Sequence, residues 1–63
     1  MNFSEFQSAI HDKGYLILCL NDYKKDEEYY TFIGIQDKLG HGYHAECKST
    51  EMDSVYEELI SKI

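Results

Sequence analysis

The sequence predicts an α+β fold in which two helices accompany a three-stranded antiparallel meander, in the order α-β-β-β-α. Three observations predict it. Apolar residues recur at helical spacing near both ends, the middle holds short runs rich in β-branched and aromatic residues, and the connections between them are short and polar. With 63 residues, no proline and no internal repeat, the chain is expected to form one small acidic domain, residues 1–63.

The first helix is predicted over residues 3–12, because its apolar residues fall on one stripe. These residues are Phe3, Phe6 and Ile10. Asn2 is a suitable N-cap with Glu5 as its capping-box partner, and Gly14 supplies a residue free to adopt the left-handed conformation that closes a helix.

Three strands are predicted next, over residues 15–20, 29–36 and 43–48. Residues 21–28 are mostly charged and are expected to form a polar connection. Residues 37–42 contain two glycines, which suits a hairpin loop with positive φ. Because these connections are short, neighbouring strands should pair antiparallel.

The last helix is expected to begin after Ser49 or Thr50 as N-cap, with Thr50 and Asp53 forming a box-like pair, and to end near Ile63. Its apolar stripe would consist of Met52, Val55, Tyr56, Leu59, Ile60 and Ile63. Acidic residues in its first turn would suit the helix dipole.

Strand alternation leaves more apolar surface than one layer of helices can cover. In the first strand, Ile17 and Cys19 would share one face and the neighbouring leucines the other. Either the two helices divide between the faces, or a partner covers a face that a monomer would leave exposed. The candidate homodimer face comprises Leu16, Leu18, Leu20, Tyr30 and Phe32.

The two cysteines are expected to be reduced. Cys19 and Cys47 would lie on the two edge strands, roughly 10 Å apart across the central strand, which is too far for a disulfide.

Several chemical classes are disfavoured by the residues present. No nucleophile, base and orienting group combine into a catalytic set, so we expect no catalytic residues and no enzyme activity. His41, His44 and Cys47 are close enough in sequence to suggest metal ligands, but strand alternation sends His44 and Cys47 to opposite faces, so no metal site is expected. No cofactor is implied either.

The element order is also that of double-stranded-RNA-binding domains, which hold phosphate with lysines at the start of their last helix. Here that segment, residues 48–54, is mostly acidic or neutral, so direct nucleic-acid binding is rejected.

The charge itself is the strongest remaining signal. Twelve acidic residues stand against six lysines, giving a net charge of −6. Such charge commonly only solubilises a small protein, but on loops it can also imitate phosphates and occupy a basic groove of a partner protein. The candidate partner-binding residues are Asp22, Asp26, Glu27, Glu28, Asp37 and Glu46.

One family comes close to this pattern. The run Met1–Phe6, followed by Ile10, Lys13 and Tyr15, resembles the opening of a small acidic anti-CRISPR family that inhibits Cas9 by imitating the PAM duplex. The resemblance implies the α-β-β-β-α order and places Asp37 where the family's loop residues help to block the PAM-reading arginines.

The chain departs from the family in two places. Gly14 stands where the family has an acidic residue, and the family's further acidic C-terminal segment has no counterpart after Ile63. Other short acidic phage proteins, such as inhibitors of uracil-DNA glycosylase, use the same physical device.

These observations predict a phage- or mobile-element-type inhibitor, a DNA mimic that binds a host nucleic-acid enzyme or defence complex through a basic groove. The alternative is a structural or regulatory homodimer that associates through its apolar sheet face. The start of the chain has no basic n-region followed by an apolar run, and no stretch is long enough to span a bilayer, so a cytoplasmic protein without membrane contact is expected.

Overall fold

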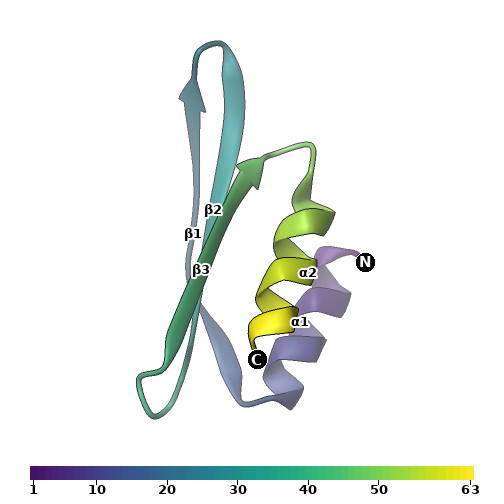
Figure 1. Cartoon of the computed structure of the whole chain (residues 1–63), viewed down its shortest axis with the longest axis vertical. Helices are drawn as coiled ribbons and strands as arrows, with labels where there is room; N and C mark the ends of the chain where they lie inside the picture. The colour runs from purple at the N-terminus through teal and green to yellow at the C-terminus, as the bar shows by residue number, and fades with distance from the viewer.

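The computed structural model describes all residues, 1–63, and confirms the predicted order of elements (Figure 1). The three strands form one antiparallel sheet in the order β1-β2-β3. The elements are α1 (Phe3–Asp12), β1 (Tyr15–Lys25), β2 (Glu28–Asp37), β3 (Gly42–Lys48) and α2 (Met52–Lys62).

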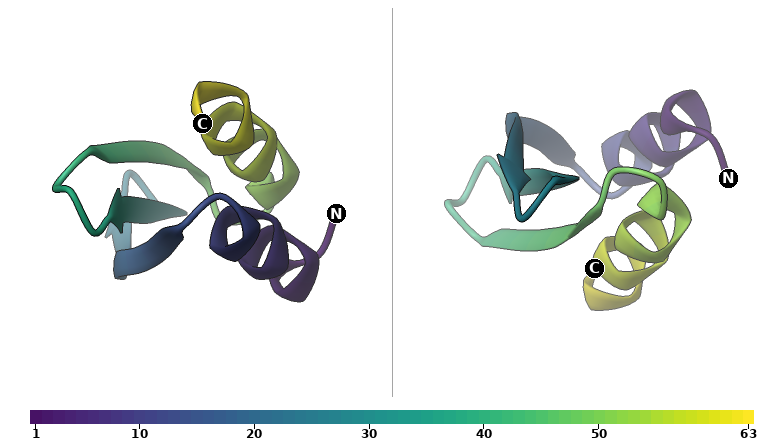
Figure 2. Two further views of the ribbon diagram at one scale, coloured as in Figure 1. Left: turned by 90° about the horizontal axis from the view of Figure 1, so that it is seen from below. Right: turned by 90° about the horizontal axis from the view of Figure 1, so that it is seen from above.

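Both helices lie on the same face of the sheet. Helix α2 packs on β3, α1 packs on β1, and the two helices contact each other. Figure 2, which looks along the strands from both ends, shows the helices side by side and no element on the other face. Of the two arrangements that the sequence allowed, the chain therefore adopts the one that leaves a sheet face uncovered.

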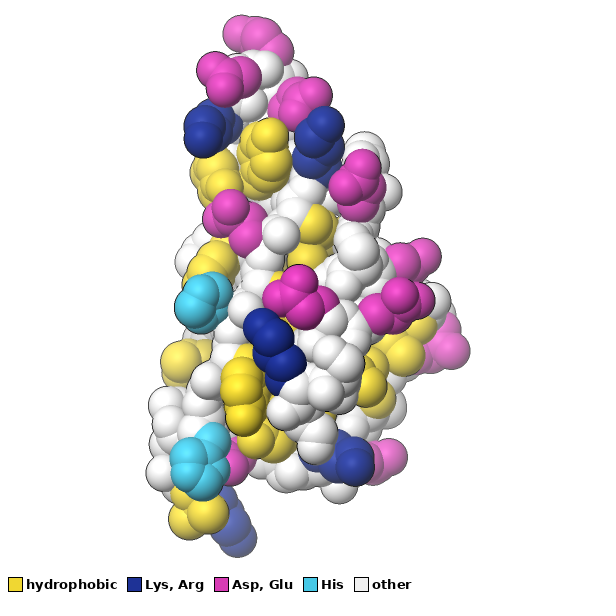
Figure 3. Space-filling model, in the orientation of Figure 1, with side chains coloured by type: hydrophobic (Ala, Val, Ile, Leu, Met, Phe, Trp, Pro, Cys, Tyr) yellow, Lys and Arg dark blue, Asp and Glu magenta, His cyan; other side chains and the backbone are white.

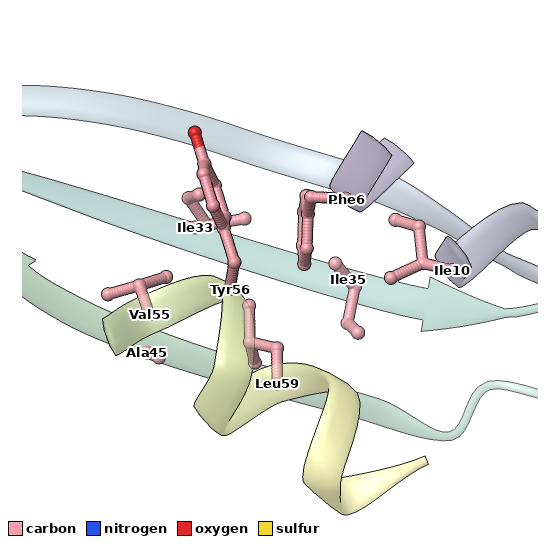
Figure 4. Close-up of a cluster of buried hydrophobic side chains, with 8 residues drawn as sticks. All are labelled: Phe6, Ile10, Ile33, Ile35, Ala45, Val55, Tyr56 and Leu59. Carbon is pink, nitrogen blue, oxygen red and sulfur yellow. The ribbon is translucent and has the colours of Figure 1, made fainter. Parts of the chain in front are cut away.

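The hydrophobic core fills the space between the helices and the covered face (Figure 4). The Phe6 ring stacks on Tyr56 with 4.7 Å between ring centroids, which joins α1 to α2. Eight residues make up this core: Phe6, Ile10, Ile33, Ile35, Ala45, Val55, Tyr56 and Leu59.

Helix α1 begins as predicted. The Asn2 side chain accepts a hydrogen bond from the Glu5 N–H at 2.8 Å, and the Glu5 carboxylate accepts one from the Asn2 N–H at 3.0 Å. This reciprocal pair is a capping box, which provides acceptors for two N–H groups that have no partner within the helix. Gly14 has φ of 84°, as predicted for the residue that ends the helix.

The predicted cap of α2 is wrong. Its N-cap is Glu51, whose side chain makes no capping hydrogen bond, and Thr50 and Asp53 form no box. The reason lies in the sheet, because Ser49 donates its N–H to the Tyr29 carbonyl at 2.9 Å and its hydroxyl lies 2.7 Å from that of Thr31. Ser49 is thus held against β2 and cannot fold back over the helix.

The predicted polar connection over residues 21–28 is mostly strand. Strand β1 runs on to Lys25, β2 begins at Glu28, and only Asp26 and Glu27 form the turn. Cross-strand contacts support the extension, because the Tyr23 ring stacks on Tyr30 at 5.4 Å between centroids. The hairpin therefore projects well beyond the helices, as Figure 1 shows.

A β-bulge at Leu18 changes the predicted faces of β1. Ile17 pairs with Ile35 but Cys19 pairs with Gly34, which leaves Leu18 as an extra residue. The prediction that Ile17 and Cys19 share a face is therefore wrong. Cys19 lies on the uncovered face, directly over Gly34, where an added Cβ would come within 2.8 Å of the Cys19 sulfur.

Candidate functional site

The structure separates the six candidate acidic residues into three places. Because a meander reverses direction at each turn, the β1–β2 turn and the β2–β3 loop lie at opposite ends of the sheet (Figure 1). Asp37 is therefore the length of β2 away from Glu28, and Glu46 lies between the two ends on the uncovered face, opposite Phe32. These residues do not form one continuous surface.

Asp37 is occupied by its own loop. Its carboxylate accepts hydrogen bonds from the backbone N–H of His41 at 2.8 Å and of Leu39 at 3.0 Å, and lies 3.1 Å from the His41 ring nitrogen Nδ1. Burial alone would raise the pKa of this carboxyl, but the hydrogen bonds from His41 and Leu39 lower it. Only 15% of its side chain is exposed, so Asp37 organises the loop and presents little negative charge to a partner.

The other end of the sheet carries the remaining acidic candidates. We call Asp22, Asp26, Glu27 and Glu28 the acidic hairpin end. Figure 3 shows acidic side chains gathered at this end, with further ones along α2.

Three of these four carboxylates have partners within the chain. Asp22 accepts a hydrogen bond from the buried Thr31 hydroxyl at 2.8 Å. Glu27 lies 3.4 Å from the Lys24 ammonium, and Glu28 lies 3.2 Å from that of Lys48. Asp26 has no such partner. The two ion pairs are exposed and add little stability, but Lys24 and Lys48 offset part of the negative charge of the hairpin end.

The turn between β1 and β2 is unusual in its residues. Asp26 has φ of 51° and Glu27 has φ of 67°, so both occupy the left-handed region that two-residue hairpin turns require. Asn-Gly is the pair that fits these positions best, and glutamate has no local advantage there. Two carboxylates are therefore held at the tip against a local conformational preference.

A hollow of about 610 Å³ adjoins this hairpin end. No local sequence pattern indicates this hollow, because its walls come from β1, the start of β2, the end of β3 and the approach to α2. Its lining residues are Asp22, Glu28, Tyr29, Lys48, Ser49, Thr50 and Glu51. The three carboxylates outnumber the one ammonium in the lining, that of Lys48, which is paired with Glu28, so the hollow suits a cationic or polar side chain better than an apolar one.

The uncovered sheet face is the second candidate surface. Strand pairing places Leu16, Cys19, Tyr23, Tyr30, Phe32, His44 and Glu46 on it. Tyr23 stacks on Tyr30, and Phe32 stacks on His44 at 5.3 Å between centroids. The prediction that Leu20 lies on this face is wrong. The bulge pairs Leu20 with the buried Ile33 and so turns it to the helix side.

The charges of this face balance. Strand pairing assigns it two lysines, Lys25 and Lys48, and two glutamates, Glu28 and Glu46. Hydrogen bonding to the Glu46 carboxylate raises the pKa of Tyr23 to about 12, so the hydroxyl stays protonated and Glu46 is engaged within the face. The net charge of −6 therefore resides on other parts of the molecule.

Neither candidate surface holds a metal cluster. No group of three or more His, Cys, Asp or Glu side chains is placed to hold a metal ion. His44 and Cys47, considered as metal ligands from the sequence, are separated, since His44 lies on the uncovered face and Cys47 pairs with Thr31 on the helix side. Both cysteine thiols are free. None of the helices has the length and apolar character needed to cross a bilayer.

Comparison of the chain with protein-family models, with curated proteins and with solved structures gives no match. The chain itself offers two chemically different surfaces: a projecting hairpin with acidic side chains at its tip, and a charge-balanced sheet face rich in aromatic residues.

Proposed function

We propose that this protein is a non-enzymatic inhibitor that inserts its acidic hairpin end into a basic, nucleic-acid-binding groove of a partner protein, where its carboxylates imitate DNA phosphates. The observation that carries the proposal is the Asp26–Glu27 turn, in which two acidic residues occupy left-handed positions at the tip of a projecting hairpin.

The turn residues oppose the local conformational preference. A left-handed conformation costs an ordinary L-residue roughly 1–2 kcal/mol, whereas glycine adopts it freely. Asp bears a smaller cost than this, and Glu bears nearly the full cost. Sites at which a sequence opposes its local preference without a structural gain are commonly functional. Glu27 gains only an exposed ion pair with Lys24 at 3.4 Å, which is worth little.

The surroundings of the turn fit a basic partner. Asp22, Glu28 and Glu51 line the hollow beside the hairpin, where a lysine or arginine of the partner would meet carboxylates and the Tyr29 ring. The net charge of −6 would steer such a partner from a distance and accelerate association at low salt.

The target class that we propose is a host nucleic-acid enzyme or defence complex, with the inhibitor supplied by a phage or mobile element. The resemblance to the anti-CRISPR family that inhibits Cas9 supports this class. Asp37 is the residue that the resemblance would place at the contact, but its carboxylate is engaged by its own loop. The proposal therefore assigns the contact to the hairpin end, at the opposite end of the sheet.

The test uses the turn itself. The double variant Asp26→Asn/Glu27→Gly replaces the acidic pair by the residues that the turn prefers. It should raise the free energy of unfolding by about 1 kcal/mol, because strain is relieved. It should also weaken capture of nucleic-acid-binding proteins from host lysate, and duplex DNA should release whatever the unaltered protein captures.

A matched control separates position from charge. Asp12→Asn/Glu57→Gln removes the same two charges from the end of α1 and from α2, where neither side chain has a partner, and should capture the same proteins almost as well. Binding should also weaken steeply as salt rises. The proposal is contradicted if the turn variant captures as well as the unaltered protein, or if duplex DNA fails to displace the captured proteins.

A further inference from the structure

We infer that the uncovered sheet face is the contact surface for a second copy of this chain, in a weak, two-fold symmetric sheet-on-sheet dimer. This inference does not depend on the proposed function, because it concerns the uncovered sheet face, which shares only Glu28 and Lys48 with the hairpin end and its hollow.

The composition of the face calls for a cover. Leu16 is 64% exposed on it, and the Tyr23–Tyr30 and Phe32–His44 stacks lie along it with no helix above them. The core is built under the other face only. Aromatic residues without net charge at the centre of a surface are typical of protein interfaces.

Charge identifies the occupant. Two molecules that each carry −6 repel one another, and this repulsion is weakest when the surfaces in contact are close to neutral. On this face Lys25 and Lys48 balance Glu28 and Glu46, so two copies can approach here without bringing like charges together. A strongly basic partner would gain nothing from a neutral face.

The size of the face sets the strength of the dimer. Three strands of seven to eleven residues give a flat footprint of roughly 400 Å² per copy, at about 4.8 Å between strands and about 3.3 Å per residue. Two copies would bury about 800 Å² in total if the faces were flat, without the extra area of projecting side chains. This area falls in the class of weak, transient interfaces. An interface of this size is expected to be weak, so the dimer should depend on concentration.

The bulge at Leu18 makes the inference sharply testable. It places Leu16 on the uncovered face and Leu20 on the helix side, although a regular strand would put both on one face. Leu16→Lys should abolish the dimer, whereas Leu20→Lys and Leu39→Lys, which introduce the same charge elsewhere, should leave it intact. All three variants lower the net negative charge, so loss of the dimer in Leu16→Lys alone cannot come from stronger overall repulsion.

The measurement is sedimentation equilibrium over about two decades of protein concentration around the micromolar range. We expect a monomer at the low end, a dimer at the high end, and stronger association as salt rises, because screening weakens the repulsion of the two −6 copies. Capture of a basic partner by the hairpin has the opposite salt dependence, so failure of one proposal is distinguishable from failure of the other.

A second readout does not depend on a charged substitution in the sheet face. Cys19 lies on the uncovered face over Gly34, whereas Cys47 lies on the helix side near Met52. In Cys47→Ser, modification of Cys19 by a thiol reagent should slow as protein concentration rises. The inference is overturned by a monomer at every concentration, by a dimer that Leu16→Lys leaves unchanged, or by Cys19 reactivity independent of concentration.

Discussion

The Asp37 carboxylate shows how one side chain can define a loop. It accepts hydrogen bonds from the N–H groups of Leu39 and His41, and these two contacts hold the β2–β3 connection in place. Composition alone could not distinguish this role from a role in binding, because an acidic residue at the start of a loop fits both. The difference lies in the backbone conformation, which turns N–H groups toward the carboxylate.

This role predicts a specific pH dependence. Because the pKa of Asp37 is lowered in the folded protein, its stabilising effect is complete above the ordinary value of 3.8 and is lost as the pH falls through the lowered pKa. Asp37→Ala should lower the melting temperature at neutral pH, and the difference from the unaltered protein should shrink in acid.

The control for this prediction is Asp37→Asn, which keeps an oxygen acceptor but removes the charge. Its melting temperature at neutral pH should lie between those of Asp37→Ala and the unaltered protein. Thermal unfolding followed by circular dichroism across a pH series measures all three. A difference between Asp37→Ala and the unaltered protein that stays constant down to the acid limit would contradict the assignment.

At the scale of elements, much of the fold was predictable from residue patterns. The stripe of Phe6 and Ile10 predicts α1, and Asn2 with Glu5 predicts how it begins, because these signals are local in sequence. The extension of β1 was not predictable in this way. Residues 21–25 are polar, and they form a strand because Tyr23 and Lys24 meet Tyr30 and Tyr29 across the hairpin.

The candidate sites were harder to predict than the elements. Four of the six acidic candidates lie at one end of the sheet, but Asp37 and Glu46 lie elsewhere, and the binding role of all six stays a prediction. The hollow beside the hairpin end depends on Glu51 and Ser49, which are distant from it in sequence. The composition of the sheet face was misjudged at Leu20, because a bulge leaves no mark in the alternation of apolar residues when every residue from Tyr15 to Leu20 is compatible with burial.

The bulge leads to a prediction about deletions. Removing Leu18 would leave Ile17 and Cys19 consecutive and keep each on its present face, so the folded structure should survive with a change of less than about 1 kcal/mol. Removing Phe32 from β2, which has no bulge, would instead leave Thr31 and Ile33 consecutive, so one of these two buried residues would turn to the uncovered face at a cost of several kcal/mol. Urea unfolding of both deletions measures the contrast, and equal destabilisation would argue against the assigned register.

At the scale of the whole molecule, stability depends on a core that lies on one side of the sheet. Only ten of the 63 residues are buried and both cysteines are free, so the core is small and has no disulfide to reinforce it. The Phe6–Tyr56 stack joins the two helices over the sheet, so this small core is cross-linked by packing between elements that are far apart in sequence.

We therefore expect Phe6→Ala to unfold the protein. Truncating a buried phenylalanine costs about 3–5 kcal/mol, which is comparable to the whole stability expected for a chain of this size. Phe3→Ala, at a ring that is 37% exposed, should cost much less. Far-ultraviolet circular dichroism without denaturant is sufficient, and a cooperatively folded Phe6→Ala would show that the core is not the main source of stability.

The bulge at Leu18 has a further consequence for solubility. Strand β1 is an edge strand of eleven residues with leucines at positions 16, 18 and 20. Long apolar edges of this kind can template uncontrolled strand addition and fibrils. The extra residue interrupts the regular row of outward N–H and C=O groups and increases the local twist, so a foreign strand cannot pair along the whole edge. The same residue that directs Leu16 and Leu20 to different faces thus also protects the chain against aggregation.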